Sequence, residues 1–123
     1  MKIISTKDAP GAIGPYSQAI VNGDLVFTSG QIPIDPAVGE VTAVTIEEQT
    51  EQACKNVAAI LAAAGTDMEH VIKTTCFLAD MGDFASFNAV YAKFFVSKPA
   101  RSCVAVKTLP KNVLCEIEAI ACL

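Results

Sequence analysis

The N-terminal part of the chain alternates short apolar runs with turn-forming residues, a pattern typical of strands. The apolar runs predict strands at residues 2–5, 18–21 and 25–29. Asn22-Gly23 separates the last two runs, and this dipeptide is the strongest short-range signal for a β-hairpin. The stretch between the first two strands is rich in proline and glycine, so we expect a loop there.

The middle of the chain changes to a helical period. Apolar residues between 46 and 64 fall on one stripe of a helix. Thr45 and Glu48 form the pattern of a capping box, in which Thr45 caps the first turn. Gly65 is suited to the left-handed conformation that ends a helix. We therefore predict a helix over residues 46–64.

A second helix is expected after Asp80 or Asp83, either of which can serve as its N-cap. Its aromatic residues recur at helical spacing, and we interpret their stripe as core rather than as a ligand cage. They are Phe84, Phe87, Tyr91, Phe94 and Phe95. Asn88 lies at the edge of this stripe and would need a partner if buried, so we favour a structural hydrogen bond over catalysis.

Three further strands complete the predicted fold. Residues 71–79, 99–106 and 114–121 are rich in β-branched and apolar side chains. A turn at residues 109–112 is expected to join the last two as a hairpin. Each helix has one apolar face, so both helices should pack on the same face of a mixed sheet. This predicts a single α+β domain whose other sheet face is covered by subunit association.

A concentrated set of polar groups lies on the last two predicted strands. Alternate side chains of a strand share a face, so Arg101 lies with Cys103, and Glu116 lies with Glu118. If the two strands pair in the right parity, a guanidinium, a thiol and two carboxylates line one surface. The alternative is an exposed face with ordinary ion pairs, such as Arg101 with Glu116 or Glu118.

Composition narrows the possible functions. Thirteen acidic against nine basic residues give a net charge of −4, which argues against a nucleic-acid-binding surface. The apolar fraction of 52% is above the usual ~45–50% and favours an oligomer. Five cysteines without a Cys-x-x-Cys pair, and one histidine, predict no metal site and suit a reducing cytoplasm. The longest apolar run, residues 57–64, is too short to span a membrane.

Three separated motifs carry a resemblance to a known family. Residues 99–104 read Pro-Ala-Arg-Ser-Cys-Val, and they are followed by a Leu-Pro turn and by Glu-Ile-Glu-Ala-Ile-Ala at 116–121. This pattern resembles the C-terminal signature of the Rid family, the RidA or YjgF-like proteins. Residues 14–19 and 27–33 resemble its N-terminal motifs. The resemblance covers nearly the whole chain, in the right order.

The resemblance implies both a fold and a function. The fold would be the chorismate-mutase-like (YjgF-like) α+β fold, formed by residues 1–123 as one Rid domain. Three copies would assemble into a homotrimer with a central barrel and with sites in the clefts between subunits. The activity would be that of a cytoplasmic enamine/imine deaminase, which hydrolyses 2-iminopropanoate and 2-iminobutanoate to 2-oxo acids and ammonia and so prevents damage by these metabolites. No cofactor is expected.

The family pattern also suggests roles for two charged residues. Arg101 would bind the carboxylate of a 2-imino or 2-enamino acid, because a guanidinium matches a carboxylate with two parallel hydrogen bonds. Glu116 would orient the attacking water. Strand geometry alone does not choose between Glu116 and Glu118, and the family pattern assigns the role to Glu116.

The remaining candidate residues would shape the pocket. A thiol beside a guanidinium can be a nucleophile, but no histidine is placed to pair with Cys103, so we assign Cys103 to substrate binding. Tyr16 offers a ring and a hydroxyl to close a small pocket. Ser29 and Gly30 complete the predicted site, with the Gly30 backbone free to approach a ligand.

One segment departs from the family pattern. Only Val96-Ser97-Lys98 separates Phe95 from Pro99, whereas many relatives have a few more residues there. Because this loop leads into Arg101, its shortening is expected to alter the rim of the pocket and the preferred substrate size.

Two other functions compete with the deaminase. The same pocket could sense a small 2-oxo acid without turnover, as a regulatory module. Alternatively, an apolar surface could give the protein a holdase-like role in protein interactions. The joint presence of Arg101 and Glu116 favours the deaminase, because sensing needs no carboxylate to orient water.

Overall fold

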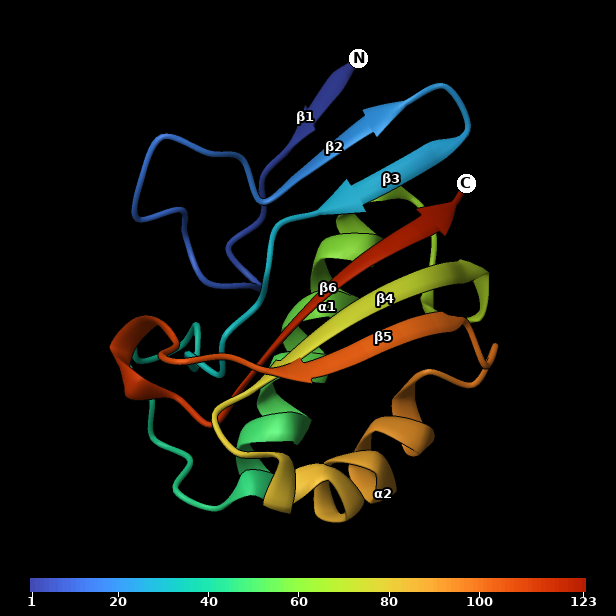
Figure 1. Cartoon of the computed structure of the whole chain (residues 1–123). Helices are drawn as coiled ribbons and strands as arrows, with labels where there is room; N and C mark the ends of the chain where they lie inside the picture. Colours follow the sequence, from blue (N-terminus) through green and yellow to red (C-terminus); the bar gives the residue numbers. More distant parts are fainter.

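A six-stranded mixed sheet carries two helices on one of its faces (Figure 1). The structure is a computed structural model and describes residues 1–123. The strands follow one another across the sheet in the order β1-β2-β3-β6-β4-β5. Their bounds are β1 Lys2–Ile4, β2 Ala19–Asn22, β3 Leu25–Thr28, β4 Val71–Leu78, β5 Ala100–Ala105 and β6 Cys115–Cys122, and those of the helices are α1 Ile46–Ala64 and α2 Phe84–Phe94.

The local signals in the sequence place the elements to within a residue or two. The hairpin of β2 and β3 turns at Asn22-Gly23, as predicted. Helix α1 begins after Thr45, whose hydroxyl oxygen accepts a hydrogen bond of 3.1 Å from the Glu48 N–H. It ends at Gly65, which adopts the left-handed conformation with φ of 91°. Both ends of α1 are therefore confirmed.

The two aspartates that the sequence offered as N-caps of the second helix have different roles. Asp80 caps a short 3₁₀ turn at Met81–Asp83, where its Oδ1 accepts a hydrogen bond of 2.7 Å from the Gly82 N–H. Asp83 stands at the N-cap of α2, but its side chain makes no capping hydrogen bond.

The predicted hairpin of the last two strands is wrong. Strand β5 pairs with β4 in parallel, and β6 lies between β3 and β4, antiparallel to both. The segment β4-α2-β5 is therefore a crossover unit, in which a helix returns the chain to a parallel neighbour. Alternate residues of β6 are fully buried, as a central position requires, whereas most β5 residues are exposed, as suits an edge strand.

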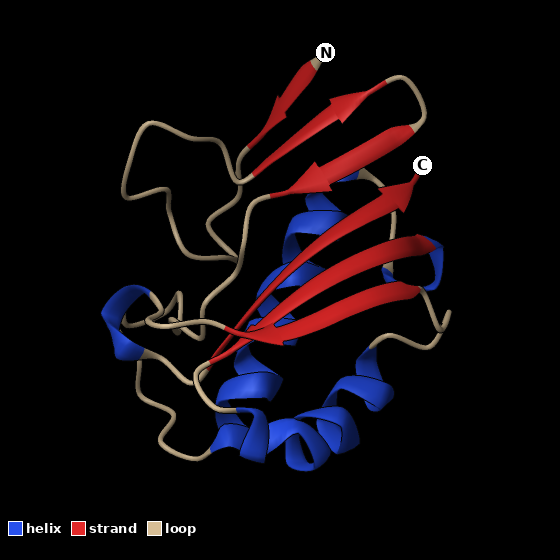
Figure 2. Ribbon diagram, viewed as in Figure 1, coloured by secondary structure: helices blue, strands red, loops and turns tan.

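Both helices pack on the same face of the sheet, as predicted (Figure 2). The core between the helices and the sheet includes Val57, Ile60, Phe87 and Ile117. The opposite face has no helix, and Phe27 there is 40% exposed. No helix of the protein combines the length and apolarity that crossing a membrane requires.

Candidate ligand-binding site

Arg101 lies on the edge strand β5 and is held by three side chains of α2. Its Nη1 donates a hydrogen bond of 2.7 Å to Asn88 Oδ1. Its guanidinium carbon lies 5.4 Å from the centre of the Phe84 ring and 4.8 Å from that of Tyr91, distances typical of cation–π contacts. Positions 84, 88 and 91 share one helix face, so α2 presents a cradle that orients the guanidinium.

The Tyr91 part of this cradle is itself anchored. The Tyr91 hydroxyl and Thr74 Oγ1 share a buried hydrogen bond of 2.6 Å. Burial raises the pKa of Tyr91 to about 12, so its hydroxyl stays neutral. The aromatic stripe is thus not core alone, as we had interpreted it. Phe87 and Phe95 are core, whereas Phe84 and Tyr91 also support Arg101.

Cys103 follows Arg101 on the same face of β5, where it pairs with Cys76 of β4. Burial raises the pKa of the Cys103 thiol, and the Arg101 charge opposes this only in part. The thiol is therefore protonated at neutral pH. This disfavours a nucleophilic role for Cys103, whose side chain packs against the core.

Glu116 lies on the other face of the sheet, directly above Gly30. A Cβ atom at Gly30 would overlap the Glu116 carboxylate and lie 2.8 Å from its Cδ. Only glycine can occupy this position while Glu116 keeps its place. The absence of a side chain at Gly30, which we expected to admit a ligand, here makes room for Glu116.

Backbone hydrogen bonds fix the segment that carries Gly30. Gln31 and Ile117 exchange two of them, of 2.7 and 3.1 Å, which attach the segment to β6. Ser29 donates a hydrogen bond of 2.6 Å from its hydroxyl to the Ser17 carbonyl, and this joins it to the loop of Tyr16. Tyr16 is exposed at the rim, and its hydroxyl oxygen accepts a hydrogen bond of 3.3 Å from the Ile13 N–H.

These residues surround a cavity of about 530 Å³. Tyr16, Ser29, Gly30, Glu116 and Glu118 all line it. Burial raises the pKa of Glu116 above its ordinary value, and the neighbouring Glu118 charge raises it further. A carboxylate with a raised pKa is a stronger base, as a group that takes a proton from water requires.

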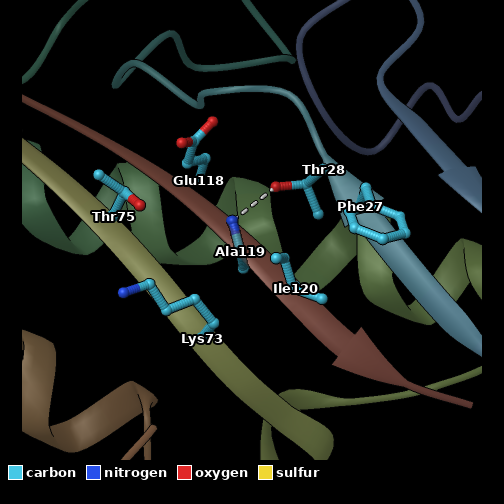
Figure 3. Close-up of a pocket in the computed structure, with 7 residues that line it drawn as sticks. All are labelled: Phe27, Thr28, Lys73, Thr75, Glu118, Ala119 and Ile120. Atoms are coloured by element: carbon cyan, nitrogen blue, oxygen red, sulfur yellow. Dashed lines mark hydrogen bonds between the residues drawn. The ribbon is translucent and has the colours of Figure 1, made fainter. Parts of the chain in front are cut away.

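Glu118 also lines a second, smaller hollow in the open sheet face (Figure 3). This hollow measures about 240 Å³, and Phe27 and Lys73 line it too. Its floor is tied by a hydrogen bond of 3.0 Å from the Ala119 N–H to Thr28 Oγ1. Glu118 thus lines both hollows, and it lies beside Glu116 on the open face of the sheet.

Within one chain, the predicted polar residues do not share a surface. Arg101 pairs with Thr74 of β4, whereas Glu116 pairs with Phe77. Positions 74 and 77 point to opposite faces of β4, so Arg101 and Cys103 lie on the helix side, and Glu116 and Glu118 lie on the open side. The single surface predicted from a hairpin is therefore wrong, because β4 separates the two strands.

The chain thus places two groups of predicted site residues on opposite faces of the sheet. One is the Arg101 cradle, and the other is the cavity of Glu116. The alternative of an ion pair between Arg101 and a glutamate is wrong, because the two ion pairs of the chain join Lys55 to Glu51 and His70 to Asp67. No group of three or more His, Cys, Asp or Glu side chains is arranged to hold a metal ion.

Comparison with known proteins identifies the family. The family model described as "Endoribonuclease L-PSP" matches residues 6–123. The chain belongs to this family, that of the Rid proteins. It is 51% identical to "Putative reactive intermediate deaminase TdcF" of Escherichia coli, over 98% of this chain and 95% of that protein. It is 60% identical to "Putative regulator AldR" of Lactococcus lactis, over 98% and 97%.

A solved structure of the E. coli relative has the same fold. The crystal structure of E. coli TdcF with bound serine superposes with a TM-score of 0.96 at 49% identity, and the match covers 100% of this chain and 98% of that one. The α+β fold of the Rid family, with two helices on one sheet face, is thus confirmed.

The sequence argument missed the role of Asn88. We expected a structural hydrogen bond, and the structure shows one, but its partner is Arg101 itself. The available signal was helical spacing, because Phe84, Asn88 and Tyr91 lie on one face of α2. Without knowing that β5 lies beside this face, the spacing did not point to Arg101.

The contact of Gly30 with Glu116 predicts the effect of a single methyl group. Gly30→Ala should displace the Glu116 carboxylate, because the three atoms nearest to the new methyl group all belong to that side chain. A flexible side chain can turn away at small cost, so we expect the free energy of unfolding to fall by about 1 kcal/mol or less. Urea denaturation measures the stability, and a crystal structure of the variant shows the position of the carboxylate. Gly11→Ala is the matched control, because a Cβ there meets no atom within 4 Å. A Glu116 carboxylate that keeps its place in Gly30→Ala would contradict the contact.

Proposed function

We propose that this protein hydrolyses 2-imino and 2-enamino acids, such as 2-iminopropanoate and 2-iminobutanoate, to 2-oxo acids and ammonia, and so removes reactive metabolites. The observation that carries this proposal is Arg101, a guanidinium that α2 holds in place and that no carboxylate of the chain neutralises. Such a group is ready to bind the carboxylate of a small substrate with two parallel hydrogen bonds.

The E. coli relative supports the same activity. The E. coli protein bears the name of a reactive intermediate deaminase, and its crystal structure holds serine, which is a small amino acid with a carboxylate. The family model is described as an endoribonuclease. We favour imine hydrolysis over RNA cleavage, because a phosphate backbone is bound by clustered basic residues and this chain carries a net charge of −4.

We infer that the site is completed between copies of the chain. Arg101 and Glu116 face apart within one copy, so a substrate that contacts both must lie between two copies. The open sheet face and the high apolar fraction support an assembly, and the family resemblance implies a homotrimer with a central barrel. In such an assembly, the edge strand β5 of one copy would meet the Glu116 cavity of the next.

The chemistry requires little beyond orientation and one base. Arg101 would hold the substrate carboxylate while a water molecule lies beside Glu116. As the water oxygen bonds to the imine carbon, Glu116 takes one of its protons and passes it to the nitrogen. The hydroxyl proton then passes to the nitrogen as the carbon–nitrogen bond breaks, and the 2-oxo acid and ammonia leave. Water supplies every atom that is added.

The other predicted residues would shape this site. The neutral Cys103 thiol, on the face of Arg101, would form its wall. Tyr16 would close the opposite side with its exposed ring, and Ser29 and Gly30 would present backbone groups to the substrate. The competing role as a sensor of 2-oxo acids would use Arg101, but it gives no reason for a half-buried glutamate with a raised pKa.

Activity can be measured by trapping the imine. A threonine or serine dehydratase releases the imine in the presence of semicarbazide, and a deaminase lowers the rate of semicarbazone formation. Arg101→Ala should weaken substrate binding about 10- to 100-fold, because a charged hydrogen-bond donor is lost. Glu116→Ala should leave 2-oxo acid binding largely intact and slow turnover about 10²- to 10⁴-fold, through loss of the base.

Two outcomes would contradict these assignments. If Glu116→Ala turns over normally and Glu118→Ala does not, the base is Glu118. If the wild-type protein leaves the semicarbazone rate unchanged and still binds a 2-oxo acid by calorimetry, the protein is a sensor instead of a deaminase.

A shared site also predicts complementation between two inactive variants. Random mixing of Arg101→Ala and Glu116→Ala subunits should restore about a quarter of the wild-type activity, because half of the subunits supply each residue. The assay follows imine hydrolysis after the mixture is refolded together. As the control, Arg101→Ala mixed with the double variant Arg101→Ala/Glu116→Ala should stay inactive. Absence of recovery in the first mixture would place the whole site within one copy.

The raised pKa of Glu116 predicts the shape of the acid limb, the part of the pH profile in which activity falls as the pH is lowered. Glu116 must be ionised to accept a proton, so activity should fall as the pH drops through its raised pKa. Glu118→Gln removes a neighbouring negative charge, which lowers the pKa of Glu116 and moves the limb toward lower pH. A pH profile of kcat/KM measures this shift. Glu47→Gln, an exposed change on α1, should leave the limb in place, and equal profiles for both variants would argue against Glu116 as the base.

A further inference from the structure

A second cation lines the cavity of Arg101. This cavity of about 500 Å³ opens between α2 and the start of β5, and Asn88, Tyr91, Lys98 and Arg101 are among the residues that line it. Neither the proposed reaction nor the family signature accounts for Lys98. Its position one residue before Pro99 places it in the loop that is shorter than in many relatives.

The charge of this cavity is unusual for so acidic a chain. The protein has thirteen acidic and nine basic residues, yet two basic and no acidic residues line this cavity. Arg101 and Lys98 each lack an ion-pair partner, because both ion pairs of the chain lie elsewhere. The positive charges of Lys98 and Arg101 act together on this cavity, and they favour a ligand with more than one negative charge.

The short loop holds Lys98 in a defined place. The Lys98 N–H donates a hydrogen bond of 3.2 Å to the Phe95 carbonyl, and the Ser97 hydroxyl donates one of 2.7 Å to the Val71 carbonyl. Lys98 adopts a φ of 51°, in the left-handed region that glycine or asparagine occupies at lower cost. The chain thus places a charged side chain where the backbone alone would favour glycine.

We propose that Lys98 determines specificity and extends the substrate range to imines with a second carboxylate. This inference rests on the proposed function. Arg101 would bind the carboxylate next to the imine carbon, and Lys98 the carboxylate at the end of the side chain. The substrate class is the 2-imino dicarboxylic acids, which arise when an enzyme oxidises the amino group of an acidic amino acid. Each would react with one water molecule to give a 2-oxo dicarboxylic acid and ammonia.

Two stable 2-oxo acids of equal length test this proposal without turnover. 2-Oxoglutarate and 2-oxopentanoate differ by a terminal carboxylate in place of a methyl group. Calorimetry should show that the full chain binds 2-oxoglutarate about three- to fivefold more tightly, as expected for one exposed charge pair. The preference should shrink as salt is added. Lys98→Gln should remove it, whereas Lys93→Gln, an exposed lysine on α2 that does not line the cavity, should retain it.

The outcomes separate this inference from the proposed function. If 2-oxopentanoate binds and its binding is lost in Arg101→Ala, the Arg101 site is supported whatever the ratio of the two affinities. A ratio near one in the wild-type protein, or an equal preference in Lys98→Gln and Lys93→Gln, would then overturn the role of Lys98 alone. If neither acid binds, both proposals fail.

Discussion

The position of β4 between β5 and β6 is the constraint on which the proposed site depends. Hydrogen-bond ladders on both sides of β4 fix the register of its neighbours, and alternate residues of every strand then face opposite ways. Arg101 is consequently on the helix side, and Glu116 is on the open side. A one-residue shift of β6 would turn Glu116 and Glu118 into the core, and a one-residue shift of β5 would move Arg101 away from α2, so the register is strongly specified.

Helix α2 uses its aromatic residues both for stability and for the site. Tyr91 stacks on Phe95 with ring centres 4.3 Å apart and lies 5.7 Å from Phe87, and the same ring supports Arg101. Movement of the Arg101 cradle would therefore disturb the core. Because the guanidinium is oriented before a ligand arrives, less conformational entropy is lost on binding.

The cavity of Glu116 depends on backbone more than on side chains. Gly30 has no side chain that could clash, and the paired backbone groups of Gln31 and Ile117 bring its segment against β6. Asn56 of α1 fixes the residues that follow Gln31, because its Nδ2 donates hydrogen bonds of 3.1 and 2.9 Å to the carbonyls of Ile32 and Ile34. The carboxylate is thereby partly buried, and burial is the main reason that its pKa is raised.

The sequence by itself determined those features that arise from neighbouring residues. The capping box at Thr45, the turn at Asn22-Gly23 and the end of α1 at Gly65 each depend on contacts within a few positions, so local chemistry predicts them. The motifs around Gly30, Arg101 and Glu116 likewise identified the candidate residues and the family.

The tertiary structure alone decided which of these residues meet. The sequence favoured a hairpin of the last two strands, because residues 109–112 form a turn and nothing local excludes it. Distant segments of a chain compete to pair as neighbouring strands. Here burial places β6 at the centre of the sheet and leaves β5 at the edge. That outcome separates Arg101 from Glu116 and gives Asn88 its partner, because side chains far apart in sequence become neighbours only through the order of the strands.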